Sequence, residues 1–248
     1  MRRRHSAYFA KRAYTVHRPI ERVAIVVVIA LVVGATIGLV LPKISDPIGE
    51  MTGEYSAGGA AAEALKTLSV DDEASSAGYD RDVFGYRSTD VGATGCDVRE
   101  AVLARDLTSV VYRRGSRCIV QSGVLHDPYT GRTIQFMRGR TTSDKVQIDH
   151  VVALQNAWRS GANRWSGAKR MRFGNDEYNL LAVDGASNQE KGSASAAYWL
   201  PTNAAYRCEY VARQIGVKEK YDLSVTSQER RSMLAVLRSC PAQTIAKE

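Results

Sequence analysis

An aspartate followed directly by a histidine stands in the apolar segment QIDHVVAL at 147–154. The alternation predicts a strand, so the side chains of Asp149 and His150 point to opposite sides and can serve different partners. Imidazole titrates near neutral pH, which suits His150 to general-base chemistry. The Asp149 carboxylate suits a hard divalent cation. Alone, the two residues could equally be an ion-pair partner and a core histidine.

Further polar residues follow in NLLAVDGASNQEKG at 179–192. Asn188 lies nine residues after Asn179, and Lys191 three residues after Asn188. On one helix, Asn188 and Lys191 are a turn apart, so the Lys191 ammonium group could face a phosphate beside Asn188. The alternatives are a helix cap for Asn188 and a solvated surface position for Lys191.

The order of these pieces is that of a known motif. A strand with Asp-His, a loop of about thirty residues, a strand with Asn and a helix with Asn and Lys resemble the ββα-metal finger of HNH nucleases. The stretch 146–201 resembles a family of exported bacterial HNH endonucleases, and the similarity extends from about Tyr79 to Cys240. The resemblance implies a metal-dependent endonuclease that acts on DNA or RNA.

The resemblance also implies a role for each polar residue. His150 would be the general base, Asp149 and Asn188 the metal ligands, and Asn179 a support that hydrogen-bonds the backbone near the base. Lys191 would face the phosphate. Phosphodiester hydrolysis needs an activated water and a cation that neutralises charge in the transition state. Mg²⁺ is the expected metal, with Mn²⁺, Ca²⁺ or Zn²⁺ as alternatives.

Two other functions fit the same sequence. The first is a non-catalytic envelope protein that binds nucleic acid or an anionic wall polymer through its basic face. The second is a secreted toxin nuclease with an immunity partner. Intact Asp149, His150 and Asn188 favour the enzyme.

The net charge of +8 is unevenly distributed. It is +6 over residues 1–22, −5 over 23–89 and +7 over 90–248. The last segment suits a polyanionic ligand. Five cations between the two strands are expected to bind backbone phosphates without reading bases, unless they form a solvated helix face. They are Arg159, Arg164, Lys169, Arg170 and Arg172.

The N-terminal region predicts export. Residues 23–41 carry no charge over nineteen positions, enough to span a bilayer core as a transmembrane anchor. The basic segment 1–22 would stay cytoplasmic and the catalytic domain outside the cell membrane. A cleaved signal sequence, which would release a secreted protein, is the alternative.

The four cysteines are expected to form two disulfides after export. Sequence order suggests Cys96–Cys118 and Cys208–Cys240, although three pairings are open.

The rest of the chain divides into a Gly-, Ala- and Ser-rich linker or stalk at 42–78, in which a short helix is expected around 60–68, and a catalytic domain at 79–248. In the domain we expect a helix from Cys96, strands over 117–125 and 132–137, the strand pair of the finger, and two C-terminal helices. The TSQE sequence at 226–229 predicts the start of the last helix. The predicted class is α+β, with an HNH finger embedded in a mainly helical domain that one transmembrane helix precedes.

Overall fold

A computed structural model describes residues 19–53, 56–73, 75–86, 95–139 and 142–245. The chain divides into two units, Met1–Glu54 and Tyr55–Glu248. Most of the predicted cytoplasmic segment 1–22 lies outside the described residues.

The first unit contains α1 (Pro19–Ile44) and α2 (Asp46–Met51). The apolar side chains of α1 are exposed. Within the described residues, α1 is the one helix long and apolar enough to cross a membrane, over Glu21–Pro42.

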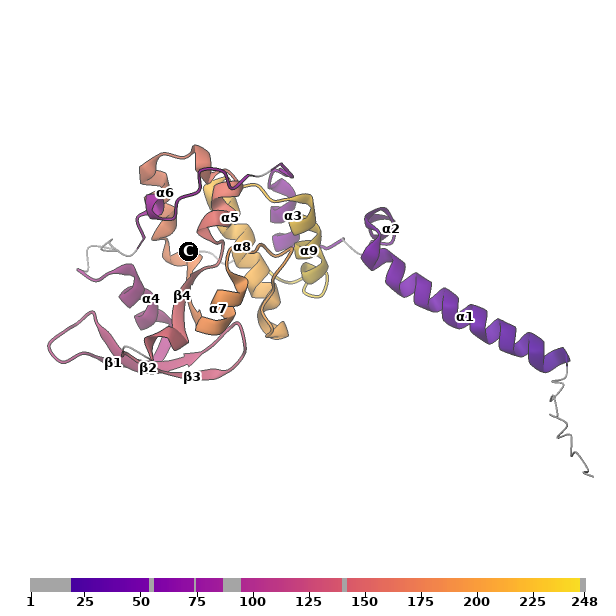
Figure 1. Ribbon diagram of the computed structural model, residues 1–248, viewed down its shortest axis with the longest axis horizontal. Coiled ribbons are helices and arrows are strands. Elements are labelled where there is room, and N and C mark those ends of the chain that lie inside the picture. The colour runs from indigo at the N-terminus through magenta and orange to yellow at the C-terminus, as the bar shows by residue number, and fades with distance from the viewer. Residues whose placement is uncertain (1–18, 54–55, 74, 87–94, 140–141, 246–248) are drawn as a thin grey trace, which may run out of the picture. The chain divides into compact units, whose positions relative to one another are not determined.

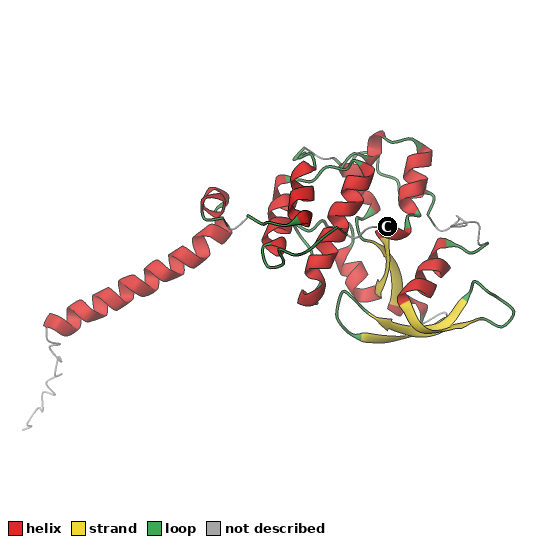
Figure 2. Cartoon of the chain, turned by 180° about the vertical axis from the view of Figure 1, so that it is seen from behind, coloured by secondary structure: helices red, strands yellow, loops and turns green. Residues whose placement is uncertain are grey.

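The second unit is a mainly helical domain with its strands gathered at one side, as Figures 1 and 2 show. Its described helices are α3 (Ala60–Thr67), α4 (Val98–Asp106), α5 (Leu154–Arg159), α6 (Gly167–Gly174), α7 (Gly185–Lys191), α8 (Arg207–Tyr221) and α9 (Ser227–Leu237). Its strands are β1 (Leu107–Tyr112), β2 (Val120–His126), β3 (Thr133–Met137), β4 (Val146–His150) and β5 (Leu180–Asp184). Short 3-10 turns are η1 (Asp82–Phe84), η3 (Ser143–Lys145), η4 (Ala162–Arg164), η5 (Glu177–Asn179) and η6 (Ala204–Tyr206). The mixed content confirms the predicted α+β class.

The strands form two antiparallel sheets, β1-β2-β3 and β4-β5. Helix α4 contacts strands of both sheets, and Figure 1 shows it above the three-stranded sheet. In the pair, Asp149 lies opposite Leu181 and His150 opposite Leu180. The two sheets and α4 therefore hold the Asp-His step against a fixed partner strand.

Strand β5 is buried on both faces because alternate residues enter different cores. Leu181 and Val183 join the cluster built around α3, α8 and α9. Leu180 and Ala182 join the cluster between α4 and the three-stranded sheet. A slip of one residue would exchange both sets, so the packing fixes the register opposite Asp149.

The prediction of a linker over 42–78 is wrong for its second half, which belongs to the folded domain. Helix α3 packs on α8 and α9, and Ala61, Ala62 and Leu65 are at most 1% exposed. The small alanine side chains allow this helix to approach closely, and they also gave it a linker-like composition. The domain therefore begins near Tyr55 rather than Tyr79.

Strand β1 was not predicted from the sequence. It follows α4 without a loop and pairs with β2, with register shifts on either side of Val111. Ser109 has a φ of 52°, which interrupts the regular extended backbone. The β-branched residues of LTSVVY are the signal that could have revealed it.

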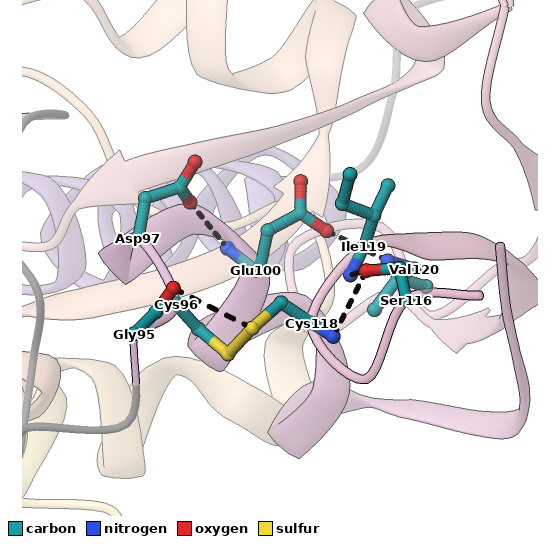
Figure 3. Close-up of a disulfide and its surroundings, with 8 residues drawn as sticks. All are labelled: Gly95, Cys96, Asp97, Glu100, Ser116, Cys118, Ile119 and Val120. Atoms are coloured by element: carbon teal, nitrogen blue, oxygen red, sulfur yellow. Dashed lines mark hydrogen bonds between the residues drawn. A yellow bond between two sulfur atoms is a disulfide. The ribbon is translucent and has the colours of Figure 1, made fainter.

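Both expected disulfides are present, Cys96–Cys118 and Cys208–Cys240. The first ties the start of α4 to the chain between β1 and β2 (Figure 3). Beside it, Asp97 accepts a hydrogen bond from the Glu100 backbone N–H and caps α4. The second joins α8 to the chain beyond α9.

Candidate active site

Asp149 is buried at the centre of a polar network. Asp149 is 5% exposed, and both of its carboxylate oxygens accept hydrogen bonds. Lys191 Nζ donates to Oδ1 at 2.9 Å, and the Tyr129 hydroxyl donates to Oδ2 at 2.5 Å. Burial raises the pKa of Asp149, while the Lys191 charge and the two hydrogen bonds oppose that rise. The carboxylate is thus held in one orientation by two donors.

Lys191 does not face an open phosphate site, which corrects the sequence prediction. The residue is 1% exposed, and its Nζ donates to the His150 carbonyl as well as to Asp149, both at 2.9 Å. Helix α7 packs on β4 with the Lys191 side of the helix facing the strand, so this side chain points inward. Lys191 therefore holds Asp149 and the His150 backbone in position from the buried side.

The His150 side chain is oriented by a backbone carbonyl. Its Nε2 lies 2.8 Å from the Gly174 oxygen at the end of α6. A carbonyl oxygen only accepts, so Nε2 carries the hydrogen, and in the neutral ring Nδ1 is the basic nitrogen. The Tyr86 ring packs edge-on against the imidazole, with centroids 5.7 Å apart. These contacts define one tautomer and one ring orientation.

Asn179 contacts the backbone beyond the histidine. Its Oδ1 accepts from the Val152 N–H at 2.8 Å, and its Nδ2 donates to the Val152 carbonyl at 3.2 Å. Its own carbonyl accepts from Val151 N–H at 2.8 Å. The side chain is fully buried and fixes the chain that leaves β4.

Asn188 shares a cavity with Asp149 and His150. This cavity, here called the Asp149 cavity, has a volume of about 420 Å³. Asn188 Nδ2 donates to Gln147 Oε1 at 2.9 Å, and Asp184 rather than Asn188 caps α7. Asn188 is therefore not the N-cap of α7, and it lines the wall of the cavity.

The donors around the Asp149 cavity suit a sparsely held hard cation. In the described part of the chain, no three His, Cys, Asp or Glu side chains converge. Asp149 and Asn188 supply carboxylate and amide oxygens. Lys191 and Tyr129 each take one bond of Asp149, and carboxylate oxygens accept more than one. Such a set fits an ion that keeps several waters, as Mg²⁺ does.

A second cavity of about 500 Å³ shares a wall with the first. We call it the Tyr86 cavity. Residues that line both cavities are Arg81, Gln147, Ile148, His150 and Asn188. The basic histidine thus lies at a boundary between two open spaces.

The five predicted phosphate-binding cations line neither cavity. Arg159 and Arg170 donate to backbone carbonyls, and Lys169 pairs with Asp222 at 3.3 Å. Arg164 and Arg172 are exposed. The structure does not bring this set to the Asp-His step.

Three contributors to the site were missed in the sequence. Tyr129 comes from the turn between β2 and β3, and Arg81 and Tyr86 from the segment around η1. A tyrosine in the polar turn HDPYTG and the aromatics of YDRDVFGY were the available signals. Their distance from Asp149 along the chain concealed their role.

Comparisons with known proteins indicate the same class of domain. Residues 97–236 match the family described as "GmrSD restriction endonucleases, C-terminal domain", over more than half of the chain. A protein of Arthroderma benhamiae, described as an uncharacterized secreted protein, is 40% identical over 178 residues. That similarity covers 71% of this chain and 82% of the relative. No solved structure matches.

The fold and the match define an α+β domain of nuclease type. The chain belongs to the GmrSD restriction endonuclease C-terminal domain family. The Arthroderma benhamiae relative is described as a secreted protein of a fungus, so it does not confirm the bacterial part of the predicted family. The N-terminal apolar helix fits a signal peptide.

Proposed function

We propose that the domain is a metal-dependent HNH-type endonuclease that hydrolyses phosphodiester bonds of DNA, and of RNA, with little sequence specificity. One observation carries the proposal. Asp149, His150 and Asn188 line a single cavity on a β4-β5-α7 unit. The family match supports the nuclease class independently of that geometry.

In this proposal, Asp149 and Asn188 hold a divalent cation, with Mg²⁺ preferred over Mn²⁺, Ca²⁺ or Zn²⁺. When bound, the cation would neutralise charge that develops on the phosphate and the leaving oxygen. Lys191 and Tyr129 keep the Asp149 carboxylate in place for this task. Because the protein supplies few ligands, water and a phosphate oxygen can complete the shell.

His150 would act as the general base. Its Nε2–H is held by the Gly174 carbonyl, so Nδ1 would take a proton from the attacking water. Asn179 maintains the chain after His150 without lining the cavity. The base and one metal ligand, Asp149, thus come from adjacent positions of β4, and the other ligand, Asn188, comes from α7.

We expect little sequence specificity because the available cations would contact backbone phosphates rather than bases. Arg164 and Arg172 are exposed on the α5–α6 region and would bind backbone phosphates. Arg159, Lys169 and Arg170 have protein partners and would contribute through the positive field of the surface.

We also propose that the domain works outside the cytoplasm. The secreted relative and the two disulfides support export. Helix α1 would serve as an uncleaved anchor, or as a signal peptide that is removed. N-terminal sequencing of protein from the membrane fraction and from the medium distinguishes the two, because only the anchored form retains 23–41.

The decisive experiment is a cleavage assay on the purified full chain, kept in detergent because of α1. Supercoiled plasmid, single-stranded DNA and RNA are incubated with Mg²⁺, Mn²⁺, Ca²⁺ or Zn²⁺, and with EDTA. We expect metal-dependent nicking that His150→Ala abolishes while DNA binding is retained. His126→Ala is the matched control, because this exposed histidine lines neither cavity.

Cleavage by His150→Ala at the wild-type rate would remove the general base from the proposal. Salt-sensitive DNA binding with no cleavage under any metal would instead support a non-catalytic binding protein.

A further inference from the structure

The segment around η1 lies outside the family match at 97–236 but is built into the site. Phe84 is fully buried and packs against Phe173, with ring centroids 6.0 Å apart. Asn175 Nδ2 donates to the Gly85 carbonyl at 3.2 Å. The segment is therefore anchored to the end of α6.

The same docking reaches the general base. A Cβ at Gly174 would lie 2.6 Å from the Phe84 carbonyl oxygen, so only glycine permits this close approach. The Gly174 carbonyl is the group that orients His150. Tyr86, two residues beyond Phe84, packs on the imidazole ring. Docking of the segment and placement of the base are thus coupled.

Arg81 projects from this segment into the wall between the two cavities. It lines both of them together with His150. Its Nε donates to the Tyr86 hydroxyl at 2.7 Å, and its Cζ lies 4.6 Å from the centre of the Tyr86 ring. Among the described residues, the hydrogen bond of Arg81 engages Nε, and the two terminal nitrogens form a planar fork that matches two oxygens of a phosphate.

The other cations near the site are committed to the protein. Of the three arginines that line the two cavities in the described part of the chain, Arg81 is the exposed one. Arg138 pairs with buried Glu100 and donates to the Val120 carbonyl, and Arg99 donates to the Val146 carbonyl.

We propose that Arg81 is a catalytic residue that binds the scissile phosphate at the boundary of the two cavities. This assignment rests on the proposed nuclease function. The guanidinium would neutralise charge that grows on the non-bridging oxygens as water attacks, opposite the carboxylate side of the site. The nucleic acid would then extend from this point into the Asp149 cavity on one side and the Tyr86 cavity on the other.

The test compares wild type, Arg81→Ala, Arg81→Lys and Arg132→Ala in the full chain. Substrates are supercoiled plasmid and the small diester bis(p-nitrophenyl) phosphate. Loss of one transition-state donor is expected to lower kcat by about 10²- to 10³-fold for Arg81→Ala on both substrates. Arg81→Lys should recover part of the loss, because lysine keeps the charge without the fork. Arg132 is exposed and lines neither cavity, so its variant should match wild type.

Added guanidinium separates phosphate contact from support of Tyr86. We expect it to restore kcat of Arg81→Ala several-fold and to leave the His150→Ala variant inactive. Tyr86→Phe, which removes the acceptor of the Arg81 Nε–H, should change the apparent KM more than kcat.

Three results would overturn the assignment in distinguishable ways. If wild type cleaves, His150→Ala does not and Arg81→Ala keeps near-wild-type kcat, the Arg81 role alone fails. If Arg81→Ala is impaired but guanidinium restores nothing on the small diester, Arg81 acts only through Tyr86. If wild type itself cleaves neither substrate, the proposed function fails and this assignment with it.

Discussion

Two buried lysine–carboxylate pairs occupy different parts of the domain. Lys191 and Asp149 belong to the candidate site, with side chains 0% and 5% exposed. Lys218 and Glu229 join α8 to α9, with side chains 1% and 2% exposed. By burial alone the two pairs cannot be told apart.

Their neighbours differ. Lys218 also donates to Asn156 Oδ1, Ser160 Oγ and the Ser224 carbonyl, none of which lines the Asp149 cavity or the Tyr86 cavity. Lys191 donates to the carbonyl of the candidate base, and its carboxylate partner lines the Asp149 cavity.

Burial disfavours a charged form in both pairs. Burial raises the pKa of Asp149 and lowers that of Lys218. The same interaction joins two helices in one region and holds candidate site residues in the other. The neighbours, rather than the ion pair, indicate function.

The largest expected contrast comes from neutralising each carboxylate. Asp149→Asn should lower cleavage by about 10³-fold, because loss of a metal ligand removes several kcal/mol of transition-state stabilisation. Glu229→Gln, assayed below its unfolding temperature, should stay within about twofold, because Glu229 pairs with Lys218 and lines neither the Asp149 cavity nor the Tyr86 cavity. Initial plasmid-nicking rates on protein shown to be folded by circular dichroism make the comparison. Equal losses of cleavage rate in both variants would show that the two buried pairs do not differ in function.

Removing the lysines tests the same contrast on stability and rate together. Lys191→Met leaves the Asp149 charge buried without its ion partner, which should cost about 3–5 kcal/mol in the free energy of unfolding. Metal affinity should also fall about 10- to 100-fold, as for other residues that orient a ligand. Urea titration and a metal titration of cleavage measure the two effects. A stability loss with normal metal affinity would make Lys191 purely structural.

Lys218→Met should cost a similar 3–5 kcal/mol while leaving the cleavage rate of the folded fraction unchanged. The double variant Lys218→Met with Glu229→Leu should recover most of that loss, since both buried charges are gone. Recovery would be incomplete because the Ser224 carbonyl still lacks its donor. Failure of the double variant to recover would show that the loss lies in packing rather than charge.

Asn179→Ala should cost about 1–3 kcal/mol, because the Val152 N–H and carbonyl lose their partner in a buried position. Cleavage should fall less than for Asp149→Asn, since Asn179 does not line the cavity. Thermal unfolding monitors the first effect. Asn163→Ala, at an exposed position, is the control and should leave the unfolding temperature unchanged.

The smallest effect is expected at the surface. Arg172→Ala should lower the slope of log K for DNA binding against log salt by about 0.9, the value for one lost phosphate contact. The cleavage rate at saturating DNA should change less than threefold, since Arg172 lines neither cavity. Fluorescence anisotropy at several salt concentrations in EDTA gives the slope. An unchanged slope would remove Arg172 from the binding surface.

The sequence predicted the parts of the site whose geometry is local. The strand with Asp149 and His150 and the order of β4, β5 and α7 follow from alternation, turn residues and spacing. Which way Lys191 points was not predictable, because it depends on how α7 packs on β4. Arg81 and Tyr129 reach the site through tertiary contacts between distant segments.

The same limit applies to the fold. Helix α3 has one bulky apolar residue, Leu65, and the rest of its buried face depends on the close approach that alanine permits. Composition therefore indicated a linker where packing makes a core helix. Strand β1 was missed because α4 runs into it without a loop.

The two crosslinks, Cys96–Cys118 and Cys208–Cys240, bear on where the domain matures. They close loops of 22 and 32 residues, each contributing about 3–4 kcal/mol in the chain-entropy account. A reducing cytoplasm withholds both contributions. The domain is then least stable beside the genome of the cell that makes it. Under the proposed function, the nuclease would reach full stability only after export, when it is separated from the DNA of the cell that makes it.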